Sequence, residues 1–140
     1  MRRSRLLILY VVAVVFAACG TQAPQIAPGP SNGPTAAAGL FTEAQSTRGD
    51  ALFASRCGSC HATREFSGRI FMIGWETRSV GEFYEFIRTA MPYDQPGSLS
   101  DQEYADVTAY VVSLNGFPAG SQELAPGADT LNEIPFGSAP

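Results

Sequence analysis

The stretch CGSCH, residues 57–61, places two thiols and an imidazole within five positions. It holds two of the three cysteines and the only histidine of the 140-residue chain. Such a concentration of ligand-forming side chains indicates that one bound group is shared by all three. We therefore expect the domain to be built around this stretch.

Three kinds of site use two cysteines at this spacing. Structural zinc takes four ligands, usually as two separated pairs, and outside CGSCH the only other cysteine or histidine is Cys19. A thioredoxin-like dithiol needs a βαβ context, and no strand pattern surrounds the motif. Cys-x-x-Cys-His is the attachment motif of c-type haem, in which the thiols bind the ring and the histidine binds the iron. The motif therefore predicts one covalent haem c held by Cys57, Cys60 and His61.

The flanking sequence predicts helices. A Ser followed three positions later by Glu, a capping-box pattern, opens two of them, and apolar side chains recur at helical spacing in all three. We expect helices that begin at Thr47, Ser79 and Ser100, the second stopped by Pro92 and the third closed by Gly116. No strand pattern competes. The predicted fold class is all-α, a small domain of three or more helices packed around one haem.

A core of this size needs additional stabilisation. Ordering costs about 1.5 kcal/mol per residue, which offsets nearly all that a domain of roughly 70 residues gains by burial. A disulfide between Cys57 and Cys60 would close too small a loop to hold three helices together. We expect the cofactor to be the packing centre.

An iron atom with one histidine ligand has a free axial position. Met72 lies in an apolar run, where methionine commonly fills a core. Met91 directly follows the second predicted helix and precedes Pro92, whose ring stiffens the backbone. We therefore favour Met91 as the second ligand and keep Met72 as a core residue. A His/Met pair stabilises ferrous iron and suits electron transfer.

The N-terminus predicts export. Three arginines within the first five residues precede an apolar run at positions 6–16, which indicates a cleavable signal peptide over residues 1–18. The run is shorter than the roughly 20 residues of a membrane-spanning helix, so a permanent span is the weaker alternative. FAAC followed by glycine resembles a bacterial lipobox, which predicts a lipid anchor on Cys19, although an ordinary cleavage site with an incidental cysteine is the alternative. The expected location is periplasmic, or the extracytoplasmic face of a membrane.

Composition divides the mature chain into three parts. Residues 19–46 are rich in proline and small residues and predict a lipid-anchored flexible linker. Residues 47–116 form the predicted haem domain. Residues 117–140 predict an extension that wraps the domain and is frayed at its end, attached by Leu124, Leu131, Ile134 and Phe136.

The charge excludes one class of partner. The chain has nine basic and thirteen acidic residues, and the signal peptide removes three arginines and no acid. Nucleic-acid binding needs a basic face, so we expect no nucleic-acid partner. An acidic surface suits a basic protein partner or simple solubility.

Residues 47–116 resemble the small monohaem class I cytochromes c. The likeness runs through RGDALFASRCGSCH and through the block from SVGEFYEFIRTAMPYDQPG to VTAYVVSLNG. It implies that Gly49 and Phe53 cross Tyr110 on the last helix. It also implies the haem ligand set Cys57, Cys60, His61 and Met91.

The second block is similar to cytochromes that serve periplasmic quinoprotein, sulfite or sulfur-compound dehydrogenases. The resemblance implies an electron carrier with no catalysis of its own, which accepts electrons from a dehydrogenase and passes them to an oxidase or another cytochrome. Two alternatives remain, the haem subunit of a dehydrogenase complex and a haem-based gas or ligand sensor.

One departure from the family concerns the histidine. Many members have a Gly-Pro pair after the motif whose carbonyl orients the histidine, and no proline lies between His61 and Met91. The hydrogen-bond acceptor for His61 is therefore unassigned. Phe53 and Trp75 are candidate haem-pocket residues, and the candidates for pairing with the haem propionates are Arg64, Arg69, Arg78 and Arg88.

Overall fold

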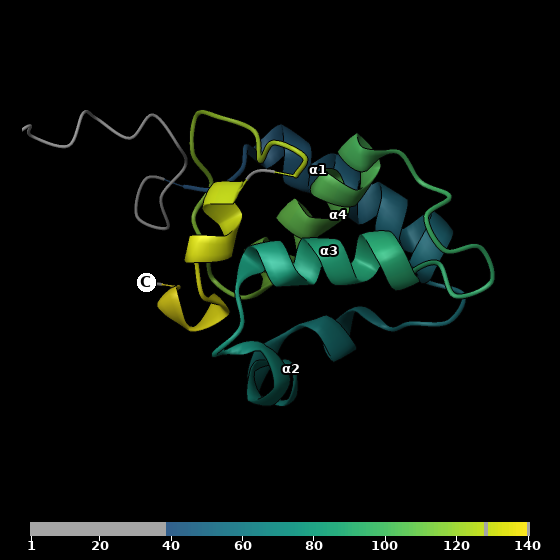
Figure 1. The fold of residues 1–140 in the computed structure, drawn as a ribbon, viewed down its shortest axis with the longest axis horizontal. Coiled ribbons are helices and arrows are strands. Elements are labelled where there is room, and N and C mark those ends of the chain that lie inside the picture. The colour runs from purple at the N-terminus through teal and green to yellow at the C-terminus, as the bar shows by residue number, and fades with distance from the viewer. Residues whose placement is uncertain (1–38, 128, 140) are drawn as a thin grey trace, which may run out of the picture. The chain divides into compact units, whose positions relative to one another are not determined.

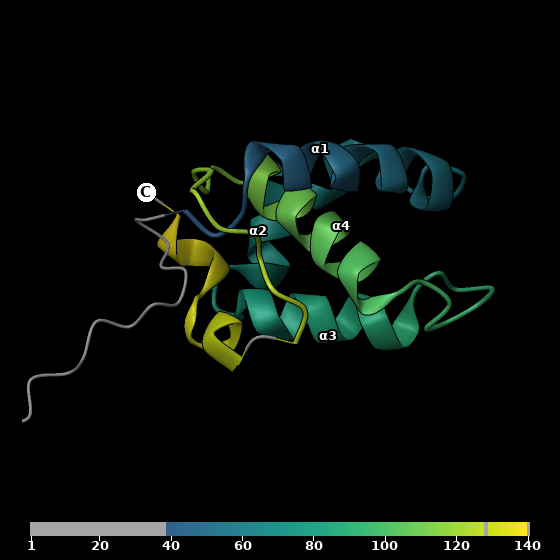
Figure 2. The same cartoon turned by 90° about the horizontal axis from the view of Figure 1, so that it is seen from above.

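A computed structural model describes residues 39–127 and 129–139. These residues form four α-helices and no named strand, which confirms the all-α prediction. Helix α4 lies between α1 and α3 in Figure 2, and α2 lies apart from them in Figure 1. The α-helices are α1 (Glu43–Leu52), α2 (Gly68–Trp75), α3 (Val80–Ala90) and α4 (Asp101–Leu114), and the shorter helical turns are η1 (Phe53–Cys57), η2 (Thr63–Phe66), η3 (Asp129–Glu133) and η4 (Phe136–Ser138).

The predicted starts of α3 and α4 are confirmed. Ser79 and Ser100 are the N-caps, and the side chain of each accepts a hydrogen bond from the backbone N–H of a glutamate three residues later. The carboxylate of each glutamate in turn accepts a hydrogen bond from the N–H of its serine, which completes both capping boxes. Gly116 follows α4 with a φ of 91°, the left-handed conformation that ends many helices.

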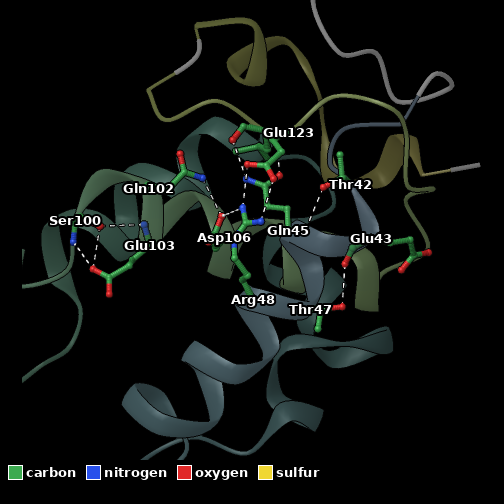
Figure 3. Close-up of polar contacts among 11 residues, drawn as sticks. Thr42, Glu43, Gln45, Thr47, Arg48, Ser100, Gln102, Glu103, Asp106 and Glu123 are labelled. Atoms are coloured by element: carbon green, nitrogen blue, oxygen red, sulfur yellow. Dashed lines mark hydrogen bonds and ion pairs between the residues drawn. The ribbon is translucent and has the colours of Figure 1, made fainter.

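The predicted start of α1 at Thr47 is wrong. The N-cap is Thr42, whose hydroxyl accepts a hydrogen bond from the N–H of Gln45 at 3.1 Å (Figure 3). Gln45 is fully buried, and its side-chain amide exchanges two hydrogen bonds with the backbone of Leu124, at 2.7 and 2.9 Å. This long-range contact pulls residues 43–46, which composition assigned to the linker, into the first helix.

Helix α2 was not predicted, because its segment reads as loop. Gly68 and Gly74 lower its helix propensity, and Ser67 makes no capping hydrogen bond through its side chain. Phe71 and Trp75, one turn apart, stack with ring centroids 6.0 Å apart and an interplanar angle of 17°. Both rings also pack against Phe83 on α3 and Phe136 near the C-terminus, with centroid distances of 5.1 to 6.1 Å, and this tertiary packing outweighs the weak local propensity.

Helices α1 and α4 cross at Gly49. A Cβ added there would collide with the carbonyl group of Asp106 and lie 2.8 Å from Cβ of Tyr110. Phe53, the next apolar residue along this face, contacts the ring of Tyr110 at a centroid distance of 5.6 Å. The crossing that the family resemblance implies is therefore present.

The C-terminal segment, residues 117–127 and 129–139, packs against the helices. Phe136 lies edge-on to Phe71 and Phe83, with centroid distances of 5.3 and 5.6 Å. Arg48 on α1 binds both Asp106 on α4 and Glu123 in the segment, which joins three parts of the fold (Figure 3). The buried apolar residues of the segment include Leu124, Leu131, Ile134 and Phe136.

The predicted signal peptide, Cys19 and most of the linker lie outside the described residues. Within residues 39–127 and 129–139, none of the helices combines the length and apolar character that a bilayer crossing requires.

Candidate haem site

The CGSCH stretch follows α1 through a widened helical turn. In η1 the N–H of Gly58 reaches back five residues to the carbonyl of Phe53 at 2.8 Å, a π-type bond that is often found at functional sites. The N–H groups of Cys60 and His61 then both bond to the carbonyl of Cys57, at 3.1 and 2.9 Å. The motif is therefore a closed turn fixed to the end of a packed helix.

This turn forms part of the wall of a cavity of about 520 Å³. The volume lies within the usual range for small-molecule and cofactor sites. Cys57, Cys60, His61 and Met91 all line it, so the structure brings together the four residues proposed as haem ligands. The apolar wall comes from α2, α3 and α4, from the turns η1 and η2, and from Leu99 before α4, and it includes Phe53, Phe66, Phe71, Trp75, Phe83, Phe86, Ile87, Leu99, Val107 and Val111.

Met91 enters the cavity from the end of α3. Its N–H bonds to the carbonyl of Ile87 at 3.0 Å, and its own carbonyl accepts the hydroxyl of Tyr104 at 2.6 Å. These two bonds fix its backbone to both α3 and α4. Met72, in contrast, is partly buried against the core and does not line the cavity.

His61 has two neighbours that the sequence analysis did not identify. Oε2 of Glu65 lies 3.2 Å from its Nδ1, and the ring of Phe66 lies edge-on at a centroid distance of 5.3 Å. Glu65 therefore supplies a hydrogen-bond acceptor where the sequence left none assigned. Its spacing of four residues from His61 is only a weak sequence signal for this contact, because the spacing brings the two side chains together only where residues 63–66 form the η2 turn.

The protein environment changes the acidity of two groups in this site. Burial raises the pKa of the Cys57 thiol, which favours its neutral form. Hydrogen bonds from the backbone of Ala62 and then from His61 lower the pKa of Glu65. The lowered pKa favours the ionised form of the Glu65 carboxylate beside His61.

Of the remaining residues predicted to contact the haem or its propionates, some line the cavity and others lie on the outer surface. Phe53 and Trp75 line the cavity, whereas Arg69 is exposed on α2 and does not. Arg78 stacks on the ring of Trp75 at 4.1 Å, outside the lining. Arg64 and Arg88 do not line it either, and the arginine that does is Arg56.

The residues present fit a covalent haem. The cavity has a mainly apolar and aromatic wall, two thiols on one turn that would hold the ring, and an imidazole and a thioether sulfur that would bind the iron. Across the described part of the chain, no three side chains of His, Cys, Asp and Glu gather closely enough to hold a metal ion by themselves. This ligand set suits iron that is supplied within a porphyrin.

Comparison with known proteins agrees with this assignment of cofactor. Residues 44–111 match the family model described as cytochrome c oxidase, cbb3-type, subunit III. No curated protein and no solved structure shows a match. The matched segment runs from α1 into α4 and contains the whole CGSCH motif and Met91. The match and the helical fold support a c-type cytochrome domain that carries a covalently bound haem c.

Proposed function

We propose that this chain is an exported electron carrier whose single haem c is attached through Cys57 and Cys60 and ligated by His61 and Met91. One observation carries the proposal: both thiols, the only histidine of the sequence and Met91 line the same cavity. When bound, the haem supplies a one-electron ferric/ferrous couple.

The residues of the chain would hold this couple in a fixed and largely apolar environment. The two cysteines fix the cofactor to the turn after α1, and the hydrogen bonds to Met91 hold its backbone in place. Aromatic rings form much of the cavity wall, among them the half-buried Trp75 and the buried Phe71 and Phe83. Fixed ligands limit rearrangement when the charge changes, which favours electron transfer over bond-making chemistry.

The Met91 assignment is tested by exchanging each methionine separately. Met91→Ala should abolish the sulfur-to-iron charge-transfer band of the ferric protein, and Met72→Ala should retain it. Loss of the band in Met72→Ala alone would contradict the ligand set. Binding of carbon monoxide by the unaltered ferrous protein would instead indicate a displaceable Met91 and support a ligand-sensing role.

For partners, we propose a dehydrogenase as electron donor and an oxidase or another cytochrome as acceptor. The description of the matched family, a subunit of a cytochrome c oxidase, supports the acceptor side. The resemblance of residues 79–116 to dehydrogenase-associated cytochromes supports the donor side. Stable co-purification with a dehydrogenase would favour a built-in haem subunit, and purification of the chain alone would favour a mobile carrier.

We propose a location in the periplasm or on the extracytoplasmic face of a membrane, on the basis of the N-terminal sequence. The basic and apolar residues of positions 1–18 support export, and Cys19 supports a lipid anchor. Cys19→Ser should move the haem protein from the membrane fraction to the soluble periplasmic fraction. An unchanged distribution would contradict the anchor.

A further inference from the structure

The ring of His61 is held by a short segment that follows it in sequence. Oε2 of Glu65 lies 3.2 Å from Nδ1, and the ring of Phe66 meets the imidazole at 84°. Within the described residues, Nε2, the second nitrogen of the ring, makes no hydrogen bond to the protein. Glu65 thus contacts the nitrogen that an iron-bound histidine would keep for a hydrogen bond.

Glu65 is itself fixed in place. Its other oxygen, Oε1, accepts the N–H of Ala62 at 3.0 Å, so the carboxylate spans the turn between backbone and imidazole. The segment is joined to α4 because the side-chain amide of Asn115 donates to the carbonyls of both Phe66 and Val111, each at 2.8 Å. The position of the carboxylate is therefore set by the fold as well as by its contact with the ring.

A histidine bound to a metal generally donates its other N–H to an acceptor, which fixes the ring and raises the basicity of the ligand. A carboxylate accepts a stronger hydrogen bond than a neutral carbonyl does. We propose that Glu65 is the positioning residue for His61, and that its carboxylate makes the imidazole a stronger donor to iron and lowers the reduction potential. This inference rests on the proposed function, because it requires His61 to be an axial ligand.

The test is a comparison of midpoint potentials in the purified, haem-loaded protein. Glu65→Gln keeps an oxygen for the Ala62 N–H and removes the negative charge. At a fixed electrode potential we expect the ferrous-to-ferric ratio of this variant to rise by about threefold to tenfold. Loss of a buried partner of a metal-bound histidine has larger effects, but Glu65 is half exposed and solvent screens its charge.

Glu82→Gln is the matched control. Glu82 is also about half exposed and also caps a helical turn, through the N–H of Ser79, but it does not line the cavity. Its potential should match that of the unaltered protein. A proton NMR measurement adds a second readout: the Nδ1–H resonance of His61 should exchange with solvent faster in Glu65→Ala than in either the unaltered protein or Glu82→Gln.

Equal potentials in Glu65→Gln and Glu82→Gln, with the low-spin haem spectrum intact, would overturn the role of Glu65 and leave the proposed function standing. A potential shift without any change in Nδ1–H exchange would also overturn it, because the carboxylate would then act only as a distant charge. An unaltered protein that lacks histidine-ligated haem would overturn both the proposed function and this inference.

Discussion

Replacing Gly49 with alanine tests the helix crossing on which the cavity depends. Helix α1 carries the CGSCH turn at its end, and α4 supplies Tyr104, Val107 and Val111 to the cavity wall. An added methyl group would lie 2.6 Å from the carbonyl carbon of Asp106 and closer still to its oxygen. Because these are backbone atoms, they cannot rotate aside as the end of a long side chain can.

The size of the effect follows from two opposing contributions. Overpacking a close contact costs about 1–3 kcal/mol, and a rigid backbone contact places Gly49→Ala at the upper end of that range. Alanine recovers about 1 kcal/mol of helix propensity relative to glycine. The net loss in the free energy of unfolding is therefore about 2 kcal/mol, which lowers the melting temperature of a domain of this size by about 8–16 °C.

Gly74→Ala on α2 is the matched control, because nothing lies within 4 Å of its added methyl group. The higher helix propensity of alanine is then the one remaining effect, and we expect the free energy of unfolding to stay unchanged or to rise by up to about 1 kcal/mol. The assay is denaturant unfolding of both haem-loaded variants, followed by far-UV circular dichroism. Equal stability of Gly49→Ala and Gly74→Ala would refute the close crossing.

Two further substitutions test the contacts of the C-terminal half. Burial alone would raise the pKa of Asp106, but hydrogen bonds from Arg48 and Gln102 outweigh it and hold that pKa below its usual value. The stability from Asp106 is therefore present above its unfolded pKa of about 3.9 and is lost as the pH falls through its lower folded value. Asp106→Asn should cost about 1–3 kcal/mol at pH 7 because it weakens the hydrogen bonds to Arg48 and Gln102. It should also flatten the loss of stability below about pH 4 in urea unfolding, and an unchanged dependence on pH in that range would contradict this. Leu124→Ala should cost about 2–5 kcal/mol because Leu124 is fully buried, with the exposed Ile73→Ala as control, and a loss equal to that of the control would show that the segment does not stabilise the fold.

Local sequence patterns predicted the features that depend on neighbouring residues. The Ser and Glu pairs at the starts of α3 and α4 determine both capping boxes within four residues, and both are present. The glycine after α4 ends the helix through its own backbone conformation. Such features need no knowledge of the tertiary structure.

The start of α1 could not be predicted in the same way. Two threonines, at positions 42 and 47, are acceptable N-caps, and the choice between them depends on burial of Gln45 against Leu124, which lies 79 residues away. Composition favoured the later threonine because the preceding residues resemble the linker. Only the tertiary contact decides between the two.

In the candidate haem site, too, some features follow from the local sequence and others depend on the tertiary structure. The ligand-forming residues of CGSCH are contiguous and were recognised from the motif, while the distinction between Met91 and Met72 came from the adjacent Pro92. Their shared cavity is visible only in the structure. The contact of Glu65 with His61 depends on the η2 turn, which has no strong sequence pattern and was therefore missed.

The central claim is that Cys57 and Cys60 bind a haem covalently. The most direct measurement is the intact mass and pyridine haemochrome spectrum of the purified chain, made in a host that matures cytochromes c and then extracted with acidified acetone. We predict that the mass increases by one haem, that the haem remains with the protein after extraction, and that Cys57→Ser/Cys60→Ser abolishes both results. A colourless but folded chain, or a haem that is removed by extraction, would contradict the account.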